Sequence, residues 1–519
     1  MPAAAFCGFY AGKADANLFN QASQVVLVRD GQRTVRTMQN DYQGPLNAFV
    51  LVVPTPTLLH KGQVRIADKA VFERLDAYSS PRMVEYPDTD PCDTRLAWGL
   101  DAHYPAPNED ALAVAANANA MGSGKALGVT VESRYSLGEY DIVNLSATQS
   151  DGLEAWLLQN GYRIPEGTAA ALKPYVRQGM KFFVAKVNLQ AQARTGFARL
   201  RPLQFAFETE EFMLPLRLGM LNAPPDKTQD LIVYALTSIG RVESSNYRTL
   251  KLPSNVDLPF FVKPQFGAFY KDMFERQLQR AQQRAVFTEY VWDVTRCDPC
   301  AADPLSRSEL LRAGVFWLDG NPDAGFAALR NADRRLAAAG KWAASAHRAD
   351  PVLLTRLHVR YSASTFAEDL MFIQTGDRDN WQARYVLKQP YASSVPACSG
   401  QMAQLDCQAL CTQRVNAVLE PGRRDLLKEE YSGKSRAMLL AECVPACSAS
   451  KKTALNGATR YYAQDLPNRL RTEKQTLADL AGWSMDRIEA MPGADKVWGH
   501  DMPSSSTPQA VLSPRGSKR

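Results

Sequence analysis

Residues 290–312 read YVWDVTRCDPCAADPLSRSELLR, and this short stretch joins a strand, a two-cysteine turn and the start of a helix. The β-branched and aromatic residues at its beginning and just before it predict a half-buried strand, namely Val286, Phe287, Tyr290, Val291 and Trp292. Ser306 and Glu309 form a capping-box pattern that predicts the start of an amphipathic helix, and Gly314 predicts its end. The stretch therefore indicates architecture more than chemistry.

The turn Cys297-Asp298-Pro299-Cys300 has three interpretations. Asp298 and Pro299 favour a tight turn that brings the two thiols within bonding reach, which predicts a structural disulfide. A redox dicysteine with Cys297 as nucleophile relies on a helix N-terminus, but here the helix is delayed until about Ser306. A zinc half-site needs a second ligand pair, and no nearby Cys or His supplies one. We expect the structural disulfide and keep a thiol-disulfide oxidoreductase as the alternative function.

Composition limits the protein class. With 519 residues, 45% hydrophobic and 22% charged, the chain is long enough for two or three globular domains. The net charge of +6 is small for this length and no long basic run occurs, so we expect no nucleic-acid partner. No uncharged apolar stretch approaches the ~18 residues of a membrane span, so we expect no transmembrane segment.

The cysteines and the N-terminus together predict export. The nine cysteines are clustered, which favours disulfide bonds, and their spacings are poor for metal, so we expect no metal and no cofactor. Cys7 and Cys92 are further candidates for disulfide bonding. Ala3 to Ala5 resemble the small-residue end of a signal peptide, which predicts a removed or truncated signal peptide and a periplasmic or secreted protein.

The pattern along the chain predicts an α+β fold of mostly antiparallel sheets with short interspersed helices, plus a helical, cysteine-rich C-terminal extension. We expect four parts: a β-meander unit with a loop (1–120), an α+β unit with the dicysteine turn (121–395), the extension (396–492) and a disordered tail (493–519). Residues 24–54 predict one antiparallel meander with a turn at Asp30-Gly31, and residues 81–119 predict a long loop.

No established catalytic motif occurs, so whether the chain is an enzyme stays open.

One predicted strand, residues 353–361, carries several polar residues. Alternation places Leu357 and Val359 on one face and Arg356, His358 and Arg360 on the other. We expect the latter to be a solvated polar face.

The extension carries two pairs of cysteines at helical spacing, Cys407-x3-Cys411 and Cys443-x3-Cys447. Residues four apart on a helix face the same way. Two such helices packed antiparallel predict the disulfides Cys407–Cys447 and Cys411–Cys443. A site of four thiolates for a metal is the alternative.

Two residues complicate this hairpin. Pro445 predicts a weakened helix around the second pair. The sequence VPACS around Cys447 also occurs around Cys398, so Cys398 is an alternative disulfide partner for the cysteines of the hairpin. We expect the cysteines of the extension to bond to one another and not to the core.

Several stretches resemble the bacterial family called domain of unknown function 2330. They are residues 7–10 (CGFY), 41–44 (DYQG), 151–162 (DGLEAWLLQNGY), 164–167 (IPEG), 175–182 (YVRQGMKF), 216–218 (LRL), 297–300 (CDPC), 366–370 (FAEDL) and 384–387 (RYVL). The resemblance covers about residues 6 to 390. It implies an exported protein and brings no activity or catalytic residue. We therefore expect an exported, non-enzymatic binding or envelope-associated scaffold, with an unknown partner in the cell envelope or among proteins.

Overall fold

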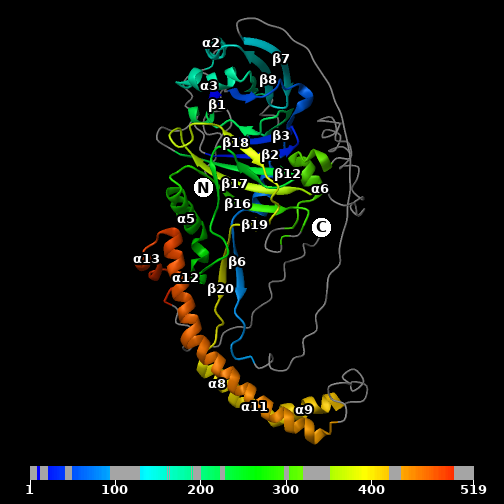
Figure 1. Ribbon diagram of the computed structural model, residues 1–519, viewed down its shortest axis with the longest axis vertical. Helices are drawn as coiled ribbons and strands as arrows, with labels where there is room; N and C mark the ends of the chain where they lie inside the picture. Colours follow the sequence, from blue (N-terminus) through cyan, green and yellow to red (C-terminus); the bar gives the residue numbers. More distant parts are fainter. Residues whose placement is uncertain are drawn as a thin grey trace. The chain divides into compact units, whose positions relative to one another are not determined.

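The computed structural model describes residues 9–11, 22–40, 50–93, 129–160, 162, 164–188, 190, 200–222, 228–296, 298, 303–318, 351–419 and 434–495. The chain divides into two compact units, and Figure 1 shows their elements. The first unit draws on residues 1–82, 106–255 and 274–384, and the second on 83–105, 256–273 and 385–519. The mixed α+β fold is confirmed. The four-part division expected from the sequence stays a prediction.

The described residues of the first unit form a nine-stranded sheet in the order β14-β16-β17-β12-β2-β3-β10-β5, with β19 paired to β16. Its strands are β2 Ala22–Asp30, β3 Arg33–Asn40, β5 Val64–Ile66, β10 Leu203–Glu208, β12 Gln229–Thr237, β14 Arg248–Lys251, β16 Ala285–Asp293, β17 Leu353–Tyr361 and β19 Trp381–Gln382. The predicted hairpin is confirmed: Asp30 pairs with Arg33, and Gly31 takes the positive φ of 54° that the tight turn requires. The β2–β12 and β14–β16 pairs are parallel.

A five-stranded antiparallel sheet has the order β1-β4-β9-β8-β7. Its strands are β1 Phe9–Ala11, β4 Val50–Thr55, β7 Val129–Leu137, β8 Tyr140–Ala147 and β9 Lys181–Val187. The prediction of one meander over residues 24–54 is wrong for β4, which joins this sheet and not β3. The physical reason is that every residue of β4 is buried, so the strand needs cover on both faces.

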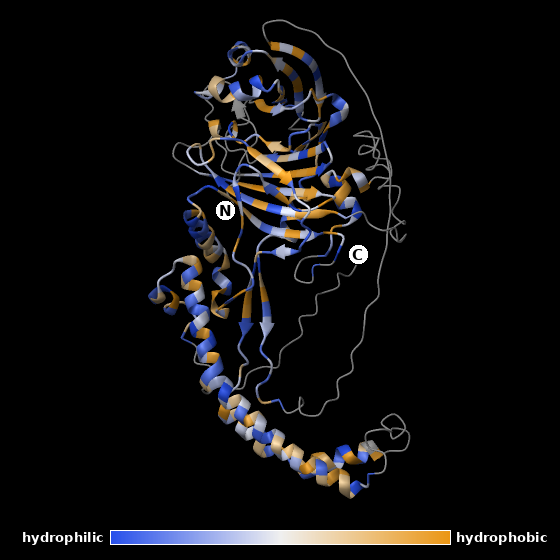
Figure 2. Cartoon of the chain, in the orientation of Figure 1, coloured by the Kyte–Doolittle hydropathy of each residue, from blue (hydrophilic) through white to orange (hydrophobic). Residues whose placement is uncertain are grey.

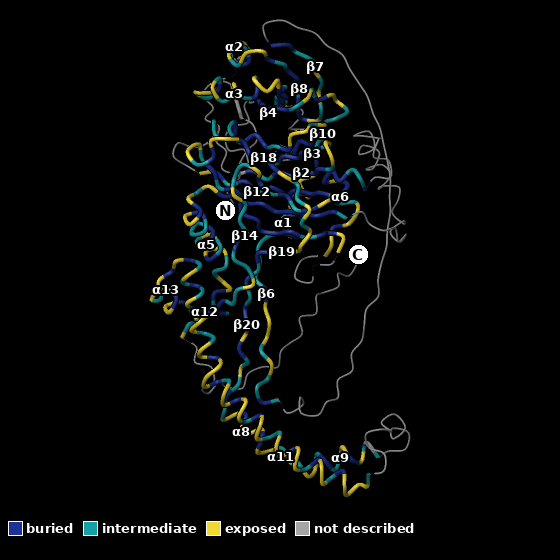
Figure 3. The backbone as a smooth tube through the Cα atoms, in the orientation of Figure 1, coloured by how far each residue is buried: buried dark blue, intermediate teal, exposed yellow. Residues whose placement is uncertain are grey.

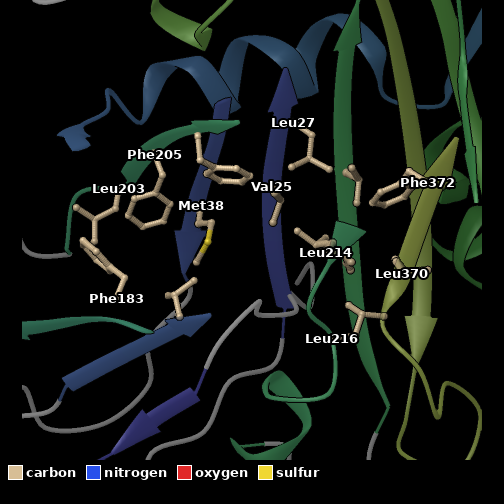
Figure 4. Close-up of a cluster of buried hydrophobic side chains, with 14 of the residues drawn as sticks. Val25, Leu27, Met38, Phe183, Leu203, Phe205, Leu214, Leu216, Leu370 and Phe372 are labelled. Atoms are coloured by element: carbon tan, nitrogen blue, oxygen red, sulfur yellow. The ribbon is translucent and has the colours of Figure 1, made fainter. Parts of the chain in front are cut away.

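The described residues of the first unit include three hydrophobic clusters. One involves both sheets and includes Val25, Leu27, Phe183 and Phe205, which Figure 4 shows converging. A second lies against α1 Ala70–Ser79 and α6 Arg307–Ala313, and a third against α2 Ser150–Gln159 and α3 Thr168–Arg177. Figure 3 shows the strands of the large sheet as mainly buried, which leaves no solvated face on its central strands.

The described part of the first unit also contains shorter elements. A three-stranded sheet has the order β11-β18-β13, with β11 Met213–Leu214, β13 Val242–Ser244 and β18 Leu370–Gln374. The single-turn helices are η1 Lys61–Gln63, η3 Gly219–Asn222 and η5 Phe316–Leu318. The helix α5 Phe266–Arg280 is shared by both units.

The second unit combines a small sheet with long helices. The sheet has the order β15-β20-β6, with β6 Arg82–Pro87, β15 Val256–Leu258 and β20 Arg384–Gln389. The prediction of a loop from residue 81 is wrong for β6, because this segment pairs with β20 and is therefore an extended strand. Only one residue of β6, Val84, is buried. The helices in the described part of this unit are η4 Phe260–Gln265, α8 Val395–Gln404, α9 Cys407–Leu419, α11 Arg436–Arg460, η6 Tyr461–Asp465, α12 Leu466–Ala481 and α13 Met485–Glu489.

The elements α11, η6 and α12 form one continuous helix, because the residues at both junctions keep helical backbone angles. The expectation that Pro445 weakens the helix is wrong, because α11 continues without a break on both sides of Pro445. Cys443 and Cys447, which flank Pro445, are both bonded to α9. The wide π turn of η6 ends at Asp465, two residues before Pro467. A proline has no N–H and its ring clashes with the carbonyl one turn earlier, which a widened turn accommodates.

Hydrophilic and hydrophobic residues alternate along these helices (Figure 2). Among the helices in the described part of the chain, none is both long and apolar enough to cross a membrane.

Candidate functional site

The polar face of β17 is a highly charged buried region of the first unit. The predicted alternation is confirmed, with Arg356, His358 and Arg360 on one face. The expectation that this face is solvated is wrong, because their side chains are only 8%, 11% and 19% exposed. Acidic side chains of neighbouring elements compensate the three cations, so burial does not leave them unpaired.

His358 is held on both ring nitrogens. Its Nδ1 lies 2.7 Å from Oε1 of Glu289 on β16, and its Nε2 lies 3.2 Å from Oδ1 of Asp230 on β12. Burial alone would lower the pKa of His358, but the charge of Glu289 and the hydrogen bonds to both carboxylates raise it above its ordinary value. Burial would raise the pKa of Asp230, yet His358 and Arg360 lower it. These shifts favour an ion pair between protonated His358 and ionised Asp230.

A β-bulge places the Glu289 carboxylate. The register of β16 against β17 shifts between Thr288 and Tyr290, so Glu289 is the extra residue. Bulges re-aim a side chain, and this one directs a 1% exposed carboxylate to both Arg356 and His358. A single glutamate thus joins two cations of the neighbouring strand.

Arg356 extends the network to α1. Its Nη1 lies 2.7 Å from Oδ1 of Asp76 and 3.0 Å from Oγ of Ser80. The hydroxyl of Tyr234 donates to the same Asp76 oxygen at 2.9 Å. Burial would lower the pKa of Arg356, but Tyr234, Glu289 and Asp76 raise it, so the guanidinium stays charged.

Arg360 completes the network on α5. Its Nε lies 2.7 Å from Oδ1 of Asp230, and its Nη1 lies 2.9 Å from Oε2 of Glu275. Four acidic residues, from α1, β12, α5 and β16, thus face three basic residues of β17. The arrangement joins a sheet to its covering helices, and it commits both nitrogens of His358, so acid–base chemistry on a substrate would first have to break an ion pair.

A second buried cluster centres on Asp369. Its Oδ1 accepts hydrogen bonds from the Tyr175 hydroxyl at 2.7 Å and from the Leu216 and Arg217 N–H groups at 2.9 and 3.1 Å. Arg217 Nη2 donates to Oδ2 at 2.6 Å. Burial and the nearby Asp369 charge raise the pKa of Tyr175. Three of the stretches that carry the resemblance, 175–182, 216–218 and 366–370, meet at this carboxylate.

The dicysteine turn is described only at Asp298, since Cys297 and Cys300 lie outside the described residues. Asp298 is buried and accepts from the Tyr290 hydroxyl at 2.9 Å and from Gln382 Nε2 at 3.1 Å. The middle of the turn is thus fastened to β16 and β19. The disulfide and redox interpretations of the two cysteines stay predictions.

The helix after the turn follows its sequence signals. The predicted capping box at Ser306 and Glu309 is confirmed, and α6 begins at Arg307 and ends at Gly314, whose φ is 105°. The first turn of α6 therefore includes neither Cys297 nor Cys300.

Two disulfides fasten α9 to α11. They are Cys407–Cys447 and Cys411–Cys443, with Cα–Cα distances of 5.7 and 5.8 Å, and they are the pairs expected from the helical spacing. Their thiols are consumed by these bonds, which leaves none of the four as a thiolate ligand. No group of three or more His, Cys, Asp or Glu in the described residues is arranged to hold a metal ion.

A third disulfide joins Cys92 to Cys398. The expectation that the cysteines of the extension bond only to one another is wrong for Cys398. Both residues belong to one hydrophobic cluster with Met402, Ala458 and Tyr462, so the segment after β6 packs with the helices. Cys7 lies outside the described residues.

The acidic partners of β17 were not identified from the sequence. They come from four separate elements, and no spacing connects them. One signal was present: Glu289 lies in the interior of a mainly apolar strand, whose other acidic residue, Asp293, is at its end, and such a buried carboxylate requires a cationic partner.

Comparison with known families gives one match. A family described as an uncharacterised protein conserved in bacteria (DUF2330) matches residues 1–373. No curated protein and no solved structure matches the chain.

Proposed function

Because the chain belongs to the DUF2330 family, which has no assigned activity, we propose from its chemistry that it is an exported, non-enzymatic binding or envelope-associated scaffold. One observation carries the proposal. All six cysteines in the described part of the chain are paired in disulfides. Such bonds form and persist in oxidising compartments and are rare in the cytosol.

The placement of the disulfides supports a scaffold. All three lie in the second unit, where the described sheet is short and the helices are long. Two of them connect α9 and α11, whose shared core is a small cluster built around the cysteines themselves. Cross-links of this kind stabilise a segment that buries too little apolar surface to be stable alone.

The charge network of the first unit supports the same role. His358 contacts Glu289 and Asp230 through its two nitrogens and Phe274 through its ring. A general base must reach the proton that it abstracts. The geometry instead gives each charged group a partner within the protein, as a rigid framework requires.

Export is tested in the bacterium that encodes the protein. A tagged copy is expressed with its own upstream region, cells are fractionated, and free thiols are blocked before non-reducing proteolysis and mass spectrometry. We expect the protein in the periplasmic or secreted fraction, with linked peptides for the three cysteine pairs. Cytoplasmic protein with free thiols at these six positions would contradict the proposal.

The absence of thiol-exchange catalysis is tested separately. The purified protein and its Cys297→Ser variant are compared in an insulin-reduction assay, with Cys407→Ser/Cys447→Ser as a matched loss of another cysteine pair. We expect no acceleration by any of them. Turnover that is lost only in Cys297→Ser would replace the scaffold by an oxidoreductase.

A further inference from the structure

Glu473 of α12 is a buried carboxyl group without a hydrogen bond. Its side chain is 1% exposed, and neither Oε1 nor Oε2 has a hydrogen-bond partner among the described residues. An ionised carboxylate in this setting is costly, because burial removes water and no donor replaces it. The neutral acid is much less costly to bury.

The two cations near Glu473 are shared with other carboxylates. Arg469 Nε lies 3.3 Å from Glu473 Oε1, which is an ion-pair distance without hydrogen-bond alignment. Its Nη1 donates to Asp88 Oδ1 at 2.9 Å, and its Nη2 lies 2.8 Å from Asp88 Oδ2 without a hydrogen bond. Lys388 Nζ of β20 binds Asp257 of β15 at 2.7 Å. Glu473 is therefore the third carboxylate in a group with two cations.

The remaining neighbours of α12 do not compensate Glu473. The hydroxyl of Tyr461 in η6 donates to Asp88. In α13, Arg487 lies 3.6 Å from Asp272 of α5. The other charged residues of α13, Asp486 and Glu489, are acidic and exposed.

This environment changes the acidity of the group. Burial raises the pKa of Glu473 to about 7, with Asp257 and Asp88 adding to the rise and Arg469 and Lys388 opposing it. The carboxyl group therefore titrates near neutral pH. A metal ion is a poor occupant, because the two cations repel it and the described acidic residues lack a metal-binding arrangement.

We propose that Glu473 is a proton-operated latch: its neutral form allows α12 to dock on the β15-β20-β6 sheet, and its ionisation weakens that docking. The helix packs directly on β15. Leu477, one turn after Glu473, is fully buried, as is Leu258 of β15. Ionisation thus adds a third negative charge, which the two cations do not compensate, to a buried contact. This pH response is separate from the scaffold role proposed above.

Hydrogen exchange of the full-length, oxidised protein tests the latch. Protection of amides in residues 466–481, corrected for intrinsic exchange, is compared at about pH 6 and about pH 8. With a carboxyl pKa near 7 folded and 4.5 exposed, linkage predicts that protection falls about tenfold over this interval. Glu473→Gln, which keeps the shape of the neutral acid, should abolish the fall.

The matched control is Glu489→Gln on α13, the same substitution at an exposed position, which should retain the wild-type fall. Amides of α9, which two disulfides hold to α11, provide an internal reference. Equal wild-type protection at the two pH values would overturn the latch, whether or not the variant folds. So would a Glu473→Gln protein with an unchanged pH response.

Discussion

The imidazole of His358 lies flat on the ring of Phe274, with centroids 3.9 Å apart and an interplanar angle of 11°. The carboxylates of Glu289 and Asp230 bind the two nitrogens at the edge of the imidazole, and the phenyl ring of Phe274 covers one face of it. A protonated imidazole also gains from the negative face of the phenyl ring. The ring is thereby fixed in position, plane and charge.

His358 should make stability depend on pH. Because its pKa is raised in the folded protein above the ordinary 6.5, its contribution is fully present below the unfolded value and is lost as pH rises through the folded value. We expect His358→Gln to lower the free energy of unfolding by about 3 kcal/mol in acid, and by less at alkaline pH. Urea denaturation over a pH series measures this difference.

The control for this series is His60→Gln, at an exposed histidine. It should shift the urea midpoint little at any pH. A cost of His358→Gln that is constant across the series would show that the imidazole acts by its shape and not by its charge.

Arg356 and Glu289 should be strongly coupled. Removing one partner of a buried ion pair leaves the other charge uncompensated, so Arg356→Met and Glu289→Gln should each cost about 3–5 kcal/mol. The double variant should cost clearly less than their sum, as a double-mutant cycle of denaturation midpoints will show. The exposed pair Lys434–Glu442 is the control, with an expected coupling of about 0–1 kcal/mol. Additive costs at Arg356 and Glu289 would contradict the network.

Asp369 should matter more than the tyrosine that binds it. Asp369→Asn removes the charge that pairs with Arg217, whereas Tyr175→Phe removes one hydrogen bond worth about 1 kcal/mol. We expect a larger drop in Tm for Asp369→Asn, measured by calorimetry. Tyr86→Phe, at an exposed tyrosine, should leave Tm unchanged. The reverse order would mean that the ion pair contributes little.

The disulfides between α9 and α11 should protect the helical hairpin. Closing the loop between Cys407 and Cys447, 40 residues apart in sequence, stabilises by about 4 kcal/mol on the chain-entropy estimate. Limited proteolysis with and without a reductant should therefore show early cleavage in α9 and α11 only after reduction. Cleavage elsewhere in the chain at the same rate would indicate that reduction unfolds the whole protein.

Local features were predictable from the sequence. The turn at Gly31 and the ends of α6 each depend on residues within a few positions of one another. The disulfides between α9 and α11 join residues 40 and 32 positions apart, but the spacing of the cysteines within each helix indicated them. The alternation along β17 is local too, and it correctly assigned His358 to the polar face.

Non-local features were not predictable. Whether that face meets water depends on Asp230, Glu275 and Glu289, which lie far from His358 in the chain. The sheet that β4 joins and the bond of Cys92 to Cys398 are likewise determined by packing between distant segments. The spacing of residues within a short stretch of sequence does not indicate such contacts.

Because the helix from Arg436 to Ala481 is continuous, the directions of the side chains near one end are fixed relative to those near the other. Near one end, Cys443 and Cys447 must face α9, and near the other, Glu473 must face β15. Each residue of an α-helix turns the chain by about 100°, so deleting one residue of η6 would rotate one set of side chains about 100° relative to the other. Sequence can therefore vary in this helix more freely than length can.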